Sequence, residues 1–124
     1  MKLPLPEFTH HILLCADQSK AKCCNMEEGL ESWSYLKKRI EELGLKKSVN
    51  RTKANCLRLC TKGPIALVYP EGAWYHSCTP EVIEKILQQH ILNDQIVSEN
   101  LLELAPLKKA DKKGDLKQAA TLGK

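Results

Sequence analysis

Hydrophobic positions along the first half of the chain change from the period of a strand to that of a helix. A short apolar run at residues 12–14 predicts a buried strand over residues 9–15. Apolar residues then recur at steps of three and four, which predicts a helix with one buried face that stops at Gly44. That face consists of Leu30, Trp33, Leu36, Ile40 and Leu43. A more polar second strand is expected near residues 47–53.

The second half of the chain begins with the unbroken apolar run at residues 65–69, as expected of a strand covered on both faces. A turn at residues 70–72 leads into a hairpin partner over residues 73–77. Thr79 and Pro80 then provide the cap and first position of another helix. Its buried face consists of Val82, Ile83, Ile86, Leu87 and Ile91. The expected element order is β-α-β followed by β-β-α, an α/β arrangement.

The 124 residues suffice for one domain, and their positive charge is concentrated near the carboxyl terminus. The net charge is +4, and residues 106–124 alone hold six Lys against two Asp. We expect a folded domain over residues 8–104 and a basic, disordered tail over residues 105–124. A lysine run without interleaved aromatic residues is typical of a solvated tail, so no nucleic-acid partner is expected.

The six cysteines are expected to be reduced. The amino terminus lacks the apolar run of a signal peptide, and no stretch reaches the length of a membrane span. We therefore expect a cytoplasmic chain without membrane insertion, where cysteine clusters bind metal or catalyse reactions and do not form disulfides. No arrangement of the four histidines supplies a nucleophile, a base and an orienting group together, so enzymatic catalysis is not expected.

Four cysteine positions follow the ends of two predicted strands. Cys15 ends the first strand, the doublet Cys23 and Cys24 lies in the loop beyond it, and Cys56 and Cys60 follow the second strand. A right-handed β-α-β crossover makes these strands parallel, so both end at the same edge of the sheet. Four thiolates that meet at one point form the ligand set of an iron–sulfur cluster or of a structural zinc ion.

Several motifs, in this order, resemble the thioredoxin-like 2Fe–2S ferredoxins over about residues 8–97. They are His11-Ile-Leu-Leu-Cys15, Cys56-Leu-Arg-Leu-Cys60-Thr-Lys-Gly-Pro64, Val68-Tyr-Pro-Glu-Gly-Ala-Trp-Tyr75 and Thr79-Pro-Glu-Val82. The resemblance implies a thioredoxin-like fold with one mixed sheet and helices packed on it. It also implies one 2Fe–2S cluster per chain, a homodimer, and one-electron transfer between redox proteins such as a reductase and an acceptor enzyme.

The resemblance further implies the cluster ligands Cys15, Cys24, Cys56 and Cys60. Cys24 is preferred over Cys23 because the family's second ligand closes the loop directly before the run into the helix, but Cys23 stays open as an alternative. Cys78 is expected at the end of an edge strand, two strands and about 10 Å from Cys15, and is therefore not expected to be a ligand.

Two other functions are compatible with the same residues. In a redox sensor, the cluster or the spare thiols Cys23 and Cys78 would report oxidation. A zinc-stabilised binding module is less favoured, because only Cys56 and Cys60 form a close-spaced pair. Cations that flank the cysteines would either tune the cluster or attract an acidic partner. They are Lys20, Lys22, Lys53, Arg58 and Lys62.

Overall fold

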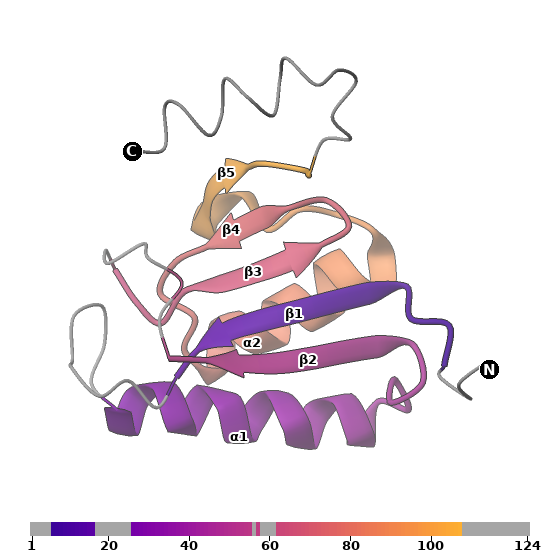
Figure 1. Cartoon of the computed structure of the whole chain (residues 1–124), viewed down its shortest axis with the longest axis horizontal. Helices are drawn as coiled ribbons and strands as arrows, with labels where there is room; N and C mark the ends of the chain where they lie inside the picture. Colours follow the sequence, from indigo (N-terminus) through magenta and orange to yellow (C-terminus); the bar gives the residue numbers. More distant parts are fainter. Residues whose placement is uncertain (1–5, 17–25, 56, 58–61, 108–124) are drawn as a thin grey trace, which may run out of the picture.

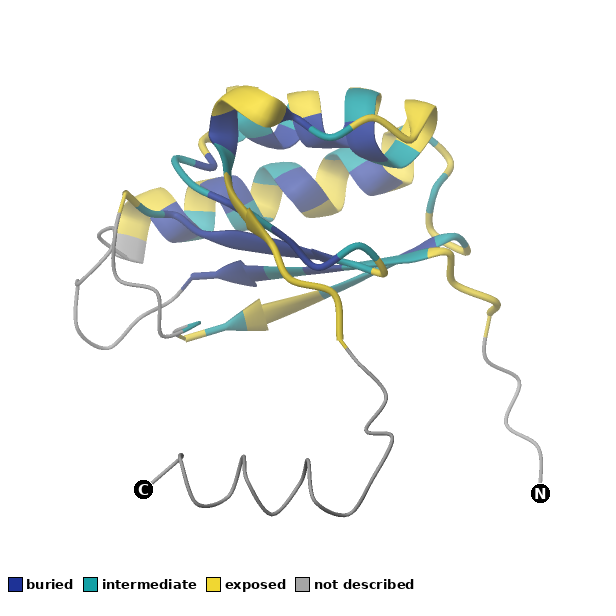
Figure 2. Ribbon diagram, turned by 90° about the horizontal axis from the view of Figure 1, so that it is seen from above, coloured by how far each residue is buried: buried dark blue, intermediate teal, exposed yellow. Residues whose placement is uncertain are grey.

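The computed structural model describes residues 6–16, 26–55, 57 and 62–107. A five-stranded mixed sheet in the order β2-β1-β3-β4-β5 forms its centre, and the two long helical segments lie on one face of this sheet (Figure 1, Figure 2). In chain order the elements are β1 (His10–Cys15), α1 (Met26–Glu42), β2 (Val49–Ala54), β3 (Ala66–Tyr69), β4 (Ala73–Tyr75), α2 (Pro80–Lys85), the π-helical turn η1 (Ile86–Ile91), the short 3₁₀ turn η2 (Ser98–Asn100) and β5 (Leu101–Leu104).

The strand pairing confirms the predicted element order. β1 and β2 are parallel, with Cys15 opposite Ala54, so the helix between them forms a crossover. β3 is antiparallel to β1, and β4 is antiparallel to β3. The predicted β-α-β unit and the following β-β-α unit therefore share one sheet (Figure 1).

A single hydrophobic core lies between the sheet and the helices. Ile12 and Leu14 on β1 are completely buried, as their two-residue spacing on one face of a strand requires. Leu36 and Ile40 come from α1 at a four-residue step, which places them on one helix face. Burial of each such side chain contributes about 1.5–3 kcal/mol. The other large apolar members of the core are Val49, Val68, Tyr75, Ile83, Ile86, Leu87 and Val97.

The two helices are also joined by a polar contact. The Arg39 guanidinium on α1 donates two hydrogen bonds to the Glu84 carboxylate on α2, with Nε at 2.7 Å and Nη2 at 3.0 Å. These hydrogen bonds lower the pKa of Glu84 to about 2, so the carboxylate is ionised near neutral pH. The Tyr35 hydroxyl donates to the same carboxylate at 2.8 Å. These hydrogen bonds link α1 to α2 through partly buried side chains.

The predicted start of the second helix is confirmed. Thr79 is its N-cap and accepts a hydrogen bond from the Val82 amide, and Pro80 occupies the first turn. The helix continues beyond Lys85 with π-helical hydrogen bonding through η1, which carries the buried side chains Ile86, Leu87 and His90.

The sheet extends one strand beyond the predicted elements. β5 pairs antiparallel with β4, so β4 is an inner strand and Cys78, which follows it, does not end an edge strand. The prediction of an edge strand before Cys78 was wrong. Three of the four residues 101–104 are exposed, so no buried periodic pattern marks this segment, and pairing with the β4 backbone makes it a strand.

No helix in the described part of the chain combines the length and the apolar character that crossing a membrane requires.

Candidate metal centre

Cys15 is held at the end of β1 by a pair of hydrogen bonds to one residue. Its amide donates to the carbonyl oxygen of Ile65 at 3.0 Å, and its Sγ accepts from the amide of Ile65 at 3.0 Å. The side chain is completely buried. Backbone contacts on the neighbouring chain segment therefore fix the sulfur in position and place an N–H dipole against it.

The carboxyl ends of β1 and β2 are joined directly. The Ala16 amide donates to the Ala54 carbonyl oxygen at 2.8 Å, one residue past the last parallel pair. The chain thus leaves both strands at the same edge of the sheet (Figure 1). This confirms the predicted location of the two strand ends. We call this edge the cysteine rim, defined by Cys15, Ala16 and Ala54.

The structure describes only the first of the four predicted ligands. Cys23, Cys24, Cys56 and Cys60 lie outside the described residues, so their convergence with Cys15 stays a prediction. Of the predicted rim cations, Lys53 and Lys62 are described, and both are exposed. Lys20, Lys22 and Arg58 lie outside the described residues.

Cys78 is a buried thiol on the chain segment after β4. Burial raises its pKa far above the usual range, an effect that a backbone hydrogen bond from Ala66 opposes and the nearby Cys15 reinforces. The thiol donates weakly to the carbonyl oxygens of Tyr75 at 3.5 Å and His76 at 3.7 Å. A metal ligand must be a thiolate, so these surroundings favour a structural role.

Sequence reasoning did not find the donor at Ile65. A backbone amide that donates to sulfur cannot be recognised from the sequence, because every residue except proline carries an N–H group. Only the antiparallel placement of the segment before β3 beside β1 brings this amide to the Cys15 sulfur.

Comparison with known proteins identifies both close sequence relatives and close structural neighbours. No family model matches the chain. The chain is 31% identical over 93 residues to a candidate 2Fe–2S ferredoxin of Priestia megaterium, covering 75% of this chain and 69% of the relative. It is 29% identical over 92 residues to a 2Fe–2S ferredoxin of Clostridium pasteurianum, covering 71% and 90%.

Among solved structures, the chain resembles a thioredoxin-like [2Fe–2S] ferredoxin from Aquifex aeolicus. The TM-score is 0.71 at 20% sequence identity, with 84% of this chain and 99% of that chain covered. A second crystal structure of the Aquifex aeolicus protein gives a TM-score of 0.69 at 21% identity and covers 78% and 99%. The shared architecture confirms the predicted thioredoxin-like α/β fold.

Proposed function

The chain belongs to the 2Fe–2S ferredoxin family, and we propose that it serves as a one-electron carrier between redox proteins. Family membership implies one 2Fe–2S cluster per chain. When bound, such a cluster accepts one electron and gains one negative charge. The observation that carries the proposal is a buried cysteine sulfur at the end of β1 that receives an amide hydrogen bond, in a chain related to 2Fe–2S ferredoxins.

Cys15, Cys24, Cys56 and Cys60 are the proposed ligands, with Cys23 as the alternative to Cys24. Support comes from the cysteine rim, where the segments that contain the other three cysteines leave adjacent strand ends. The donor set fits the cluster, because thiolates are its usual ligands. The Ile65 amide stabilises negative charge on the Cys15 sulfur and therefore favours the reduced state.

The proposal includes a cytoplasmic location and a homodimer. A thiolate-bound cluster suits a reducing compartment. For a homodimer, the support is the exposed edge of the sheet, where Leu102 and Leu104 on β5 are 39% and 48% exposed. Exposed apolar side chains on an edge strand favour pairing with another chain.

Sensing through the spare thiols is a weaker candidate than electron transfer. Oxidation sensors present a thiolate to solvent, whereas Cys78 is completely buried and its pKa is raised by that burial. A zinc-stabilised module is also weaker, because the sequence relatives are 2Fe–2S ferredoxins.

The rate of electron transfer to a reductase should fall as salt increases. Lys53 and Lys62 are exposed near the cysteine rim and would attract an acidic partner, an effect that salt screens over about 8 Å at physiological ionic strength. At low salt, the double variant Lys53→Glu with Lys62→Glu should slow the second-order rate about tenfold or more. Stopped-flow kinetics across a salt series measures both effects.

Lys46→Glu with Lys47→Glu is the matched control for this experiment, because it makes the same change in net charge and both residues are exposed in the connection between α1 and β2, away from the rim. It should leave the rate near that of the unmodified chain. If the rate changes neither with salt nor with the rim substitutions, these cations do not attract the partner, and tuning of the cluster is the role that is left for them.

Removal of residues 108–124 should leave the cluster spectrum and the melting temperature close to those of the full chain. We propose a domain over residues 8–104 and a basic tail over residues 105–124, of which residues 108–124 are dispensable. The few apolar residues of that segment cannot offset the entropy of ordering it. Ala105 still donates to the Gly72 carbonyl oxygen at 2.8 Å, so the cut is placed after residue 107. Removal of residues 101–124, which deletes β5, should lower the melting temperature. A clear loss of stability with the shorter deletion would show that the tail packs on the domain.

A further inference from the structure

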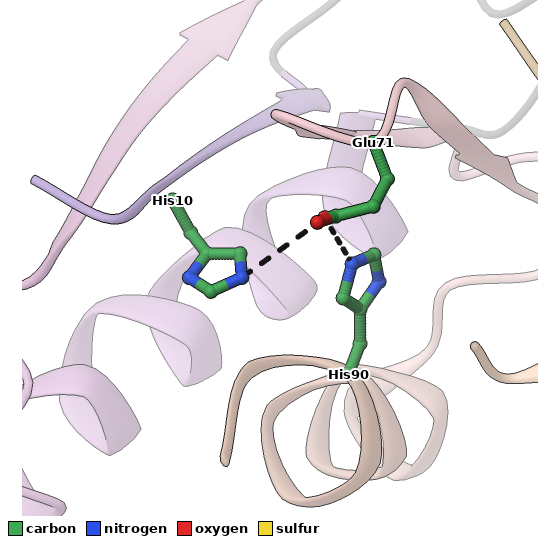
Figure 3. A group of neighbouring side chains, drawn as sticks. All are labelled: His10, Glu71 and His90. Atoms are coloured by element: carbon green, nitrogen blue, oxygen red, sulfur yellow. Dashed lines mark hydrogen bonds and ion pairs between the residues drawn. The ribbon is translucent and has the colours of Figure 1, made fainter. Parts of the chain in front are cut away.

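Three potential metal ligands meet at the end of β1 opposite Cys15. His10 comes from β1, Glu71 from the turn between β3 and β4, and His90 from η1 (Figure 3). The candidate ligand atoms all lie within 4.8 Å of one another. Glu71 Oε1 is 2.7 Å from His90 Nε2 and 4.0 Å from His10 Nε2. The His90 side chain is completely buried, whereas those of His10 and Glu71 are 13% and 32% exposed.

The group lies at the opposite end of β1 from Cys15, the one proposed cluster ligand that the structure describes. Five residue steps along β1 separate His10 from Cys15, which corresponds to about 17 Å. His10 and Cys15 are therefore too far apart to bind the same ion.

Hydrogen bonding directs a lone pair of His10 into the group. The Thr9 hydroxyl donates to the Ser48 carbonyl oxygen at 3.1 Å, so its oxygen is left to accept from His10 Nδ1 at 2.9 Å. With the proton on Nδ1, Nε2 carries a lone pair that faces the Glu71 carboxylate. Two hydrogen-bond acceptors, His10 Nε2 and Glu71 Oε1, then face each other across 4.0 Å, and a cation bound between them would stabilise this arrangement.

The protonation states also suit a metal ion. Burial lowers the pKa of His10, and the neighbouring His90 adds to this, whereas Glu71 and Asp94 oppose it. Burial by itself would raise the pKa of Glu71, but hydrogen bonds from His90 and from its own backbone, with the two imidazoles, lower it overall. Near neutral pH the group therefore contains a neutral His10 imidazole and an ionised carboxylate, the forms that bind metal.

A second group orients the buried imidazole. His90 Nδ1 is 2.8 Å from the Tyr75 hydroxyl, which accepts a hydrogen bond from the Val97 amide at 3.2 Å. Because the ionised Glu71 carboxylate can only accept, His90 Nε2 carries the proton and Nδ1 accepts from the Tyr75 hydroxyl. In a metal-binding histidine the other ring nitrogen usually donates a hydrogen bond instead. Binding at Nε2 would move the His90 proton to Nδ1, where the Tyr75 oxygen can accept it.

We propose that His10, Glu71 and His90 form a binding site for a divalent first-row transition ion, with zinc as the best match. Two imidazoles and one carboxylate, with a fourth position open to solvent, are a ligand set that zinc accepts. Bonds of 2.0–2.1 Å in a tetrahedral site place ligand atoms roughly 3.3 Å apart. The 2.7 Å and 4.0 Å separations would each change by under about 1 Å. The ion would link β1, the β3–β4 turn and η1.

The test is zinc binding to the cluster-containing full chain, measured by competition with a chelating dye and by zinc X-ray absorption. We expect one zinc ion per chain with nitrogen and oxygen ligands at about 2.0–2.1 Å, and an unchanged visible spectrum of the cluster. His10→Gln and Glu71→Gln should each weaken zinc binding at least tenfold. These two residues are partly exposed, so the substitutions leave the buried His90 and its contact with Tyr75 in place.

His11→Gln is the matched control, because His11 is the next residue on β1 and contacts Thr52 on β2 instead. Its zinc affinity should equal that of the unmodified chain. If His10→Gln and Glu71→Gln bind zinc as tightly as the unmodified chain does, or if the unmodified chain does not bind zinc stoichiometrically, the proposal is overturned. The three side chains would then form only a hydrogen-bonded group. Sulfur ligands at about 2.3 Å with loss of the visible spectrum would show zinc at the cysteines and would also overturn it.

Discussion

Replacement of Cys15 by serine should abolish or strongly alter the visible absorption of the 2Fe–2S cluster. The Cys15 sulfur is buried and receives the Ile65 amide, so a serine oxygen at the same position would change both the ligand and its hydrogen bond. Cys24→Ser, Cys56→Ser and Cys60→Ser should have the same effect. Absorption spectra, with iron and sulfide assays that give about two of each per unmodified chain, measure the result.

Cys78→Ser is the matched control, because Cys78 is equally buried and lies outside the proposed ligand set. Its spectrum should equal that of the unmodified chain. A normal spectrum for Cys24→Ser together with an altered one for Cys23→Ser would reverse the assignment within the doublet. A normal spectrum and iron content in Cys15→Ser would move the cluster away from the cysteine rim.

Gly72→Ala should lower the free energy of unfolding by about 3 kcal/mol. Gly72 has a φ of +70°, where an L-residue is strained, and an added Cβ would collide with the Ala105 carbonyl group and lie 2.7 Å from the Pro106 nitrogen. Both neighbours are backbone atoms, so relief requires the chain after β5 to move. That movement would break the hydrogen bond from the Ala105 amide to Gly72. Denaturant unfolding measures the loss.

Gly44→Ala separates the two contributions to this loss. Gly44 has the same φ of +70°, but apart from its chain neighbours no atom of the described residues lies within 4 Å of its added Cβ, so only the backbone strain of roughly 1–2 kcal/mol should appear. Equal losses of unfolding free energy in the two variants would show that the chain after β5 can move away from the added Cβ without loss of stability. The cluster spectrum should be normal in both variants, because neither glycine lies at the cysteine rim.

Much of the fold was predictable because its signals are local. The apolar runs of β1 and β3, the helical period of α1 and the cap of α2 each lie within a few residues of one another. The placement of Cys15 at an edge shared with the end of β2 was also predictable, since a β-α-β crossover joins parallel strands, which end at the same edge of the sheet. The motifs around the cysteines also indicate the correct fold family, because they lie in short, continuous stretches of chain.

Other features depend on contacts between distant residues. β5 has no periodic pattern of its own, so only pairing with β4 makes it a strand and turns β4 into an inner one. The Ile65 amide meets the Cys15 sulfur only through the pairing of β3 with β1.

The sequence by itself therefore determined the order of the elements, the cap of α2 and the candidate ligands, because period and capping act over short stretches of chain. The tertiary structure alone decided which polar groups meet. Glu71 lies sixty-one positions after His10, and the sequence around each residue gives no sign that the two side chains are neighbours. Strand register and helix packing bring them to His90, because burial of the shared core sets where each side chain points.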